Sequence, residues 1–280
     1  MTVGRALALL AIALSGGTAA AQTIAPDNGE TSAAILGTTL RVFTYRPPCA
    51  PQLVLAVFHG VGRDAGPYRD EARPLADRLC AIVVSPEFDA GRFPTAKYQR
   101  GGVMENGKFL PPGKRTVDMV APLIAWARQV SAQPALPYAL IGHSAGGQFL
   151  SRVAAYAAPD AVHIVIANPS TWVLPSLTDA APYGFGKVPD AEAALRAYLA
   201  LPITVLLGGA DTGTHNLSSE PEAVAQGANR LMRGRTTFAK AQAAAREHGW
   251  TFGWTEAEVP AVGHSATKMF ASHQAAAAFR

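Results

Sequence analysis

The sequence is poor in cysteine and in charge. Only two cysteines, Cys49 and Cys80, occur among 280 residues, and charged residues make up 16% of the chain. Two cysteines cannot supply a zinc site by themselves, and their spacing matches no zinc-binding motif. The net charge of +4 is not gathered into clusters of lysine and arginine with interleaved aromatic residues. We therefore expect neither a metal centre nor nucleic-acid binding.

Long hydrophobic segments are also missing. The apolar run at residues 6–14 is too short to span a bilayer, and no later segment is long and apolar enough. This run follows Arg5 and precedes three alanines at 19–21, an arrangement typical of a signal peptide cleaved before Gln22. An uncleaved anchor is the alternative interpretation. We expect residues 1–21 to be a signal peptide and the mature protein to be secreted or periplasmic, without stable membrane insertion.

No internal repeat, low-complexity tract or interdomain linker occurs, so residues 22–280 are predicted to form a single domain. Continuous apolar runs alternate with segments of helical periodicity, which favours a mostly parallel sheet with helices on both faces. The predicted fold class is therefore α/β, a three-layer α/β/α sandwich. The polar residues 22–33 are expected to be a loose N-terminal segment. The expected strands lie at 39–47, 52–58, 81–88, 138–142, 163–169, 203–211 and 251–260, and the expected helices at 116–130, 145–158, 190–200, 237–249 and 266–279.

Two insertions interrupt this alternation. In residues 89–115, Asn106-Gly107 between short apolar runs is a strong signal for a two-residue β-hairpin turn. Residues 170–189 contain aromatic residues among prolines and glycines, and they are too short for a large lid domain. We expect these insertions, together with residues 212–235, to form the walls of a cleft.

The motif G-x-S-x-G occurs at residues 142–146, with Ser144 at its centre. A predicted strand ends before it and a predicted helix begins directly after it, so the serine lies in a sharp turn at the carboxyl edge of the sheet. Small residues at Gly142 and Gly146 relieve steric clashes in such a turn. The N-terminus of the following helix favours negative charge that develops near the hydroxyl. These features predict a nucleophile; the alternative is an inert serine in a glycine-rich packing turn.

A serine nucleophile needs a general base and an acid that orients the base. Asp211 follows one predicted strand and His264 follows the last one, so both belong to the sheet edge where Ser144 lies. The chain order serine, aspartate, histidine is the order that this architecture uses. Asp179, in the second insertion, is the main alternative acid. The other histidines are expected to have structural or solvated roles: His59, His143, His163, His215, His248 and His273.

A tetrahedral intermediate also needs N–H donors aimed at its oxyanion. The N–H of Ala145, directly after the serine, is the first candidate. The second lies in the loop FHGVG after an earlier strand, where Gly60 and Gly62 permit a turn that directs the N–H of Val61 inward. The alternative for this loop is an ordinary turn at the end of a strand.

Two stretches carry a resemblance to a known family. The segment LVLAVFHGVGRDAGPYRDEARPLADRLCAIVVSPE at 53–87 and the motif GHSAGG resemble the α/β-hydrolase superfamily. Within it they are similar to secreted polyhydroxybutyrate depolymerase-like and feruloyl-esterase-like serine esterases. Val61 departs from many depolymerases, which carry cysteine there, and their Cys- and Trp-rich tract is missing. The resemblance implies an α/β-hydrolase fold with a short cap insertion, and hydrolysis at a Ser-His-Asp site.

The resemblance also bears on the cysteines. It implies that the strands following Cys49 and Cys80 are neighbours, with each cysteine near the amino end of its strand. A structural disulfide between the two is therefore expected, in keeping with an oxidising compartment. Two free buried thiols are the alternative.

Together these features predict a secreted serine hydrolase that cleaves carboxylic esters through an acyl-enzyme intermediate. Its partner would be a small-molecule or polymeric ester substrate, and the chemistry requires no metal or organic cofactor. One alternative is an amide or peptide (polyamide) hydrolase that uses the same residues. Basic residues around the hairpin are candidates for attracting an anionic polymer, or are merely solvated: Arg92, Lys97, Arg100 and Lys108. Another alternative is a non-catalytic binding protein that keeps the fold.

Overall fold

A computed structural model describes residues 23–280. The predicted signal peptide and its cleavage site before Gln22 lie outside the described residues. Within the described part, no helix combines the length and the hydropathy that crossing a membrane requires.

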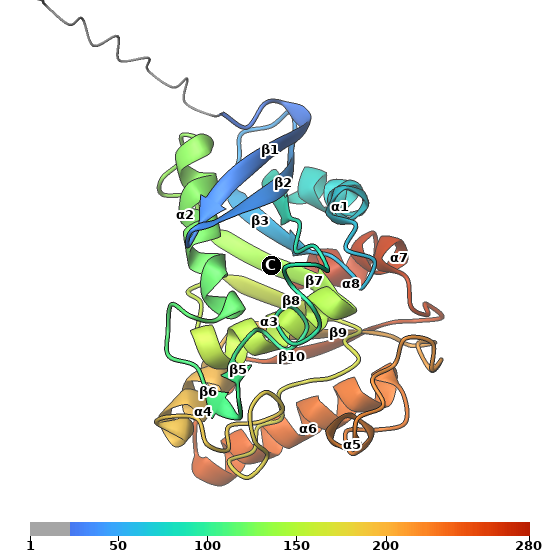
Figure 1. The fold of residues 1–280 in the computed structure, drawn as a ribbon. Coiled ribbons are helices and arrows are strands. Elements are labelled where there is room, and N and C mark those ends of the chain that lie inside the picture. The colour runs from blue at the N-terminus through green and yellow to red at the C-terminus, as the bar shows by residue number, and fades with distance from the viewer. Residues whose placement is uncertain (1–22) are drawn as a thin grey trace, which may run out of the picture.

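An eight-stranded sheet forms the centre of residues 23–280 (Figure 1). In spatial order its strands are β1 (Asp27–Ile35), β2 (Thr38–Arg46), β4 (Ala81–Pro86), β3 (Leu53–Phe58), β7 (Tyr138–His143), β8 (His163–Ala167), β9 (Ile203–Gly208) and β10 (Thr255–Val259). The pairs β1–β2 and β2–β4 are antiparallel, and all other neighbours are parallel. The mostly parallel sheet predicted from the apolar runs is confirmed.

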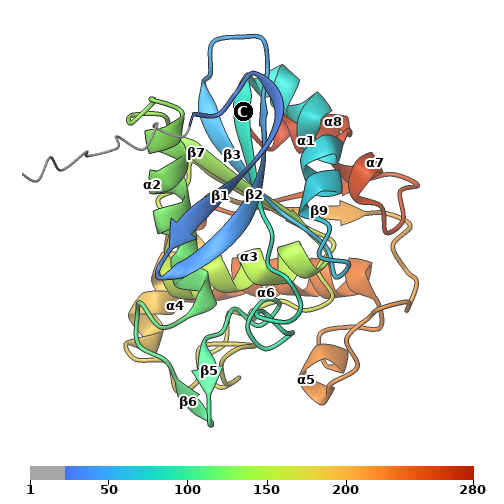
Figure 2. The same ribbon diagram turned by 45° about the horizontal axis from the view of Figure 1, so that its top comes forward.

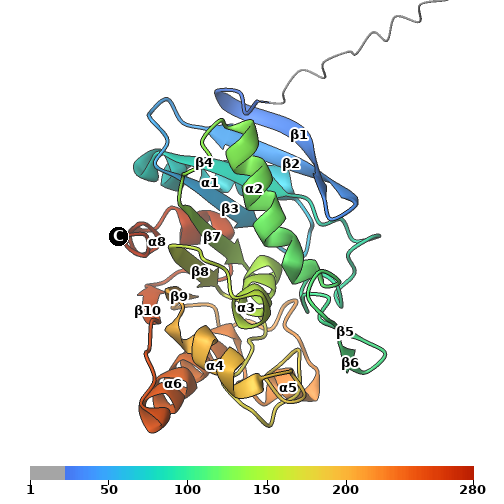
Figure 3. The same cartoon turned by 90° about the vertical axis from the view of Figure 1, so that its left-hand side faces the viewer.

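Helices cover both faces of this sheet (Figures 1 and 3). One face carries α1, α7 and α8, and the other carries α2, α3, α4 and α6. Each face has its own cluster of buried apolar side chains, so the fold is the three-layer sandwich that the sequence predicts. The helices are α1 (Ala65–Leu79), α2 (Val120–Val130), α3 (Ala145–Ala157), α4 (Ala191–Ala200), α5 (Pro221–Val224), α6 (Arg230–His248), α7 (Ala266–Phe270) and α8 (His273–Ala277), with a 3₁₀ helix, η1, at Thr116–Met119.

The N-terminal segment differs from the prediction. Residues 22–33 were expected to be loose, but β1 begins at Asp27 and pairs with β2 over its whole length. Ala33 and Ile35 are buried, whereas the residues between them and earlier in the strand are mostly exposed. This is an edge strand with one solvated face, so its polar composition conceals the strand.

Two predicted helices also differ in extent. The helix expected at 237–249 begins earlier, at Arg230, because the side chain of Asn229 accepts a hydrogen bond from the Met232 N–H and caps the first turn. The helix expected at 266–279 is divided into α7 and α8, because Ser272 caps a new helix by accepting from the Ala275 N–H.

The first insertion contains the predicted hairpin. Strand β5 (Met104–Glu105) pairs with β6 (Lys108–Phe109), and the hairpin projects away from the sheet (Figure 2). Asn106 and Gly107 have φ values of +49° and +73°. Positive φ at both turn residues is what this hairpin turn requires.

The second insertion is packed down onto the protein body. Trp172 and Phe185 are completely buried. The buried guanidinium of Arg152, on α3, donates hydrogen bonds to the backbone carbonyls of Thr171 and Pro182. Trp172 and Phe185 therefore belong to the core rather than to an open flap, while Tyr183 is half-buried.

Cys49 and Cys80 form a disulfide, as the family resemblance implied. The two cysteines precede β3 and β4, which are parallel neighbours with Leu53 opposite Ala81. The disulfide therefore joins the amino ends of these strands, opposite the edge at which Ser144 lies.

Candidate active site

The turn between β7 and α3 holds Ser144 in a strained backbone conformation. Its φ of +58° and ψ of −115° lie in a region that residues with side chains rarely adopt. Hydrogen bonds on both sides maintain it: the Ser144 N–H donates to the carbonyl of Ala167, and its own carbonyl accepts from the N–H of Gln148, both at 3.0 Å. Ser144 therefore lies at the carboxyl edge of the sheet and at the N-terminus of α3, as predicted.

The glycines on either side of the serine are required by close backbone contacts. A Cβ atom on Gly142 would lie 2.6 Å from the carbonyl oxygen of Gly146. A Cβ atom on Gly146 would overlap the backbone carbonyl of Phe58, the last residue of β3. The motif thus lets helix α3 start directly against the neighbouring strand.

His264 lies between Ser144 and Asp211. Its Nε2 is 2.9 Å from Ser144 Oγ, and its Nδ1 is 2.7 Å from Asp211 Oδ2. The Asp211 side chain is 1% exposed and the His264 side chain 29% exposed. With Nδ1 donating to the buried carboxylate, Nε2 is left with a lone pair directed at the serine hydroxyl. The structure brings the three predicted residues together and leaves Asp179, the alternative acid, in the second insertion (residues 170–189, the cap insertion).

The loops that carry the acid and the base are tied to each other. Asp211 follows β9, and His264 follows β10. The Gly209 N–H donates to the carbonyl of Val259 at 2.9 Å, and the next N–H along the chain donates to the carbonyl of Val262 at the same distance. The separation of Asp211 and His264 is therefore set by backbone hydrogen bonds rather than by the two side chains alone.

His59 organises the loop that was predicted to supply an oxyanion donor. Its Nδ1 lies 3.0 Å from the carbonyl oxygen of Gly60, and its Nε2 accepts the N–H of Phe88 at 3.0 Å. These contacts hold the turn at Gly60 and Val61 in place beside Ser144. The structural role expected for His59 is thereby seen, while the N–H of Val61 as an oxyanion donor stays a prediction.

A cleft of about 310 Å³ opens beside the serine. Asp64, Tyr68 and Glu71 of the α1 segment form one side of it, and the α7 segment with His264 forms the other. Of the segments expected to form its walls, only 212–235 contributes, through Asn216. The lining residues are Gly60, Val61, Gly62, Asp64, Tyr68, Glu71, His143, Ser144, Asn216, His264, Ser265, Ala266 and Thr267.

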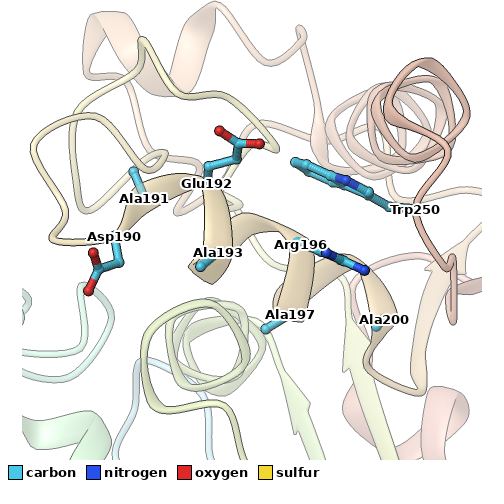
Figure 4. A pocket seen from close by; sticks show the side chains of 8 residues that line it. All are labelled: Asp190, Ala191, Glu192, Ala193, Arg196, Ala197, Ala200 and Trp250. Carbon is cyan, nitrogen blue, oxygen red and sulfur yellow. The ribbon is translucent and has the colours of Figure 1, made fainter.

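A larger surface cavity of about 730 Å³ lies elsewhere, along α4 and against Trp250 (Figure 4). Its lining includes Glu192 and Arg196 on α4, but none of the residues around Ser144. Its size does not make it the candidate reaction site, because the predicted nucleophile and base, Ser144 and His264, both line the smaller cleft.

Two buried groups set the electrostatics of the site. The His143 ring lies 4.5 Å from the His264 ring, centroid to centroid, and its Nδ1 is 3.3 Å from the Tyr68 hydroxyl. Burial, together with the nearby charges of His264 and Arg230, holds the pKa of His143 well below its usual value, so His143 is neutral. The Arg230 guanidinium lies 3.6 Å from Asp211 Oδ1 and is the positive charge next to the buried carboxylate.

Two solved structures are similar to this protein in both fold and sequence. The poly(3-hydroxybutyrate) depolymerase from Bordetella parapertussis is 31% identical, with a TM-score of 0.81 over 88% of both chains. The poly(aspartic acid) hydrolase-1 from Sphingomonas sp. KT-1 is 33% identical, with a TM-score of 0.83 over 91% of this chain and 98% of that one. The chain belongs to the α/β-hydrolase superfamily. The resemblance predicted from the motifs is confirmed.

More distant structures share the fold of this α/β hydrolase. A thermostable esterase from Pseudomonas putida ECU1011 is 17% identical and has a TM-score of 0.53. No protein-family model matches the sequence, and the search of curated proteins found no match. The relatives therefore identify a hydrolase of ester or amide bonds. They do not distinguish between these two bonds, so the choice has to be argued from the residues of the cleft.

Several residues of the hydrolase site were not predicted from the sequence. Tyr68 and Glu71 enter the cleft from α1, and Arg230 reaches Asp211 from the first turn of α6. Asn229 is a typical N-cap residue, so the sequence could have predicted that α6 begins at Arg230. No local pattern indicates that Glu71 lines the same cleft as Ser144.

The buried His59 should make the stability of the hydrolase dependent on pH. Burial lowers the pKa of His59 from 6.5 to about 4 in the folded protein. Between these values the unfolded state binds more protons at this residue, so His59 alone lowers the free energy of unfolding by about 3 kcal/mol as the pH drops from about 6.5 to 4. Urea denaturation at a series of pH values measures this, and the H59Q variant should lose that part of the slope. An unchanged slope in H59Q would contradict the assignment.

Proposed function

We propose that this α/β hydrolase cleaves carboxylic esters with Ser144 as nucleophile, His264 as general base and Asp211 as the orienting acid. The observation that carries the proposal is the chain of two contacts through His264, 2.9 Å to Ser144 Oγ and 2.7 Å to Asp211 Oδ2. Both distances fit direct proton transfer and a charge-assisted hydrogen bond.

The reaction follows from this arrangement. Ser144 Oγ attacks the ester carbonyl while His264 Nε2 takes its proton, and Asp211 stabilises the imidazolium that forms. The tetrahedral intermediate collapses when His264 returns that proton to the leaving alcohol. A water molecule, activated by the same histidine, then hydrolyses the acyl-enzyme and regenerates the serine.

The oxyanion is proposed to bind the N–H groups of Ala145 and Val61. Ala145 is the first residue of α3, so its N–H has no partner within the helix. Val61 lines the same cleft as Ser144, in a turn held by His59. One such donor is worth about 3–4 kcal/mol of transition-state stabilisation.

The charge of the cleft favours a neutral ester over a polyanionic amide. Its lining contains the carboxylates of Asp64 and Glu71, and no lysine or arginine appears among its lining residues. Arg100, a candidate for attracting an anionic polymer, is instead buried and paired with Glu220 at 2.8 Å. A second candidate, amide hydrolysis, is supported by the 33% identity to a poly(aspartic acid) hydrolase.

Two measurements test this function. A fluorophosphonate probe is expected to label the folded protein at Ser144, and matched p-nitrophenyl esters and p-nitroanilides with the same acyl group compare the two bonds. We expect kcat/KM for the ester to exceed that for the anilide, and poly(3-hydroxybutyrate) to be degraded in preference to poly(aspartic acid). Absence of labelling would remove the enzymatic function, and preference for the anilide and the polyamide would favour the second candidate.

We also propose that the mature hydrolase is secreted or periplasmic. The signal-peptide pattern of residues 1–21 supports this, and so does the disulfide between Cys49 and Cys80, because such bonds persist in oxidising compartments. Mass spectrometry of the exported protein should find Gln22 at its N-terminus. Recovery of the full-length chain from the membrane fraction would favour an uncleaved anchor.

A further inference from the structure

Arg230 is buried against the proposed acid of the site. The side chains of Arg230 and Asp211 are each 1% exposed, and Arg230 Nη1 lies 3.6 Å from Asp211 Oδ1. Arg230 Nη2 donates to the carbonyl oxygen of His215 at 2.7 Å. One end of the guanidinium is thus anchored to backbone, and the other faces the carboxylate.

The carboxylate of Asp211 lies between two nitrogen groups. Its Oδ2 contacts His264 Nδ1, and its Oδ1 faces Arg230. The backbone carbonyl of Asp211 also accepts the N–H of Leu231, in the first turn of α6. At 3.6 Å the guanidinium acts on the carboxylate mainly through its charge, and burial strengthens that interaction because little water screens it.

Arg230 differs in this respect from the nearby buried arginines. Arg152 and Arg233 bind backbone carbonyls of the cap and the following loop, and Arg100 binds Glu220, Gln148 and Thr171. Their partners account for a structural role. The guanidinium of Arg230 instead lies next to the carboxylate of Asp211. Its Nε is buried without a hydrogen-bond partner among the described residues. This incomplete pairing indicates that the position is not optimised for loop packing alone.

Other titratable groups also face the Asp211–His264 pair. Asp64, Tyr68 and Glu71 reach the cleft from the α1 segment, His143 packs on the His264 ring from β7, and His215 lies in the loop after Asp211. Burial raises the pKa of Glu71, and His143 is neutral. The neighbours on the α1 side are therefore acidic or neutral, and a positive charge that opposes protonation of the pair comes from α6.

We propose that Arg230 is a positioning residue whose buried charge holds the Asp211 carboxylate in place beside His264, so that removing this charge changes the pH dependence of the reaction. The inference rests on the proposed function, since it requires His264 to accept the proton of Ser144. Removing the charge of Arg230 makes protonation of the Asp211–His264 pair easier. The acid limb of activity then moves to higher pH.

The pH profile of kcat/KM for a p-nitrophenyl ester tests this. In R230Q the acid limb is expected to move up by about 1 pH unit, so that kcat/KM on that limb falls about 10-fold relative to the plateau. R230K retains the charge but not the span of the guanidinium, so its plateau should fall while its limb stays at the wild-type position. R233Q is the matched control: it removes an equally buried arginine that contacts backbone carbonyls, and it should leave the limb unmoved.

The outcomes separate this inference from the proposed function. If the wild-type protein is neither labelled by fluorophosphonate nor active, the proposed function fails. If the wild type is active and the limb of R230Q coincides with it, or R233Q shifts the limb equally, the role of Arg230 is overturned. The folded fraction of each variant is measured by circular dichroism at every pH of the profile, and kcat/KM is expressed per folded protein, so partial unfolding of R230Q does not mask the result. Should R230Q not fold at all, R230K decides, because a shift of its limb with the charge retained would overturn the proposal.

Discussion

The S144A variant is expected to lose about 10⁵-fold in kcat/KM for a p-nitrophenyl ester while remaining folded. The loss follows because alanine has no oxygen to form the acyl-enzyme, and water in the cleft lacks the fixed position of Ser144 Oγ, 2.9 Å from His264 Nε2. Residual catalysis by the oxyanion donors sets the remaining rate. Fluorophosphonate labelling should disappear completely.

Stability should change little in the same variant. The backbone at this position keeps its φ of +58° with alanine, which tolerates that region no better than serine does. The lost hydrogen bond to a partly exposed imidazole is worth about 1 kcal/mol. Thermal unfolding of S144A should therefore remain cooperative and close to that of the wild type.

A neighbouring serine provides the control. Ser265 lines the same cleft, but its hydroxyl caps α7 by accepting from the Lys268 N–H. S265A should still be labelled by the probe and should keep activity within about 10-fold of the wild type. Labelling of S144A, or more than about 1% of wild-type activity in it, would show that the nucleophile lies elsewhere.

The parts of the fold that were predicted are those where one local pattern suffices. β3, β7 and β9 are buried on both faces, so nothing interrupts their apolar runs. The turn at Ser144 was recognisable because a strand, a small-residue motif and a helix follow one another without a gap. Asp211 and His264 could be selected because parallel strands bring their carboxyl ends to the same edge.

The remaining features depend on contacts between segments distant in sequence. β1 is an edge strand that is stabilised by its pairing with β2, and its polar sequence alone does not predict a strand. Glu71 faces the cleft only because α1 packs beside α7, and Arg230 faces Asp211 only because α6 starts at that point. The cap insertion was expected to line the cleft, but Trp172 and Phe185 pack into the core, where burial removes their apolar surface from water.

Asp211→Asn is expected to lower kcat/KM by about 10⁴-fold, although it preserves the shape of the side chain. The reason lies in the two neighbours of the carboxylate. Arg230 is a donor only, so the amide oxygen of the new side chain should face the guanidinium, 3.6 Å from Oδ1 in the wild type. The amide NH₂ must then face His264 Nδ1, which has to accept a hydrogen bond instead of donating one.

That reversal places the proton of the imidazole on Nε2, directed at Ser144 Oγ, and a protonated Nε2 cannot take the proton of the serine. The nitrogen chemical shifts of His264 should therefore report the opposite tautomer in D211N, while the fold is unchanged. D179N, at the alternative acid in the cap insertion, is the matched control and should stay within about twofold of the wild-type rate. If D179N lost activity and D211N kept it, the acid would have to act from the cap. The 2.7 Å contact between Asp211 and His264 argues against that outcome, because an imidazole already held by a buried carboxylate leaves its Nδ1 proton unavailable to a second acid.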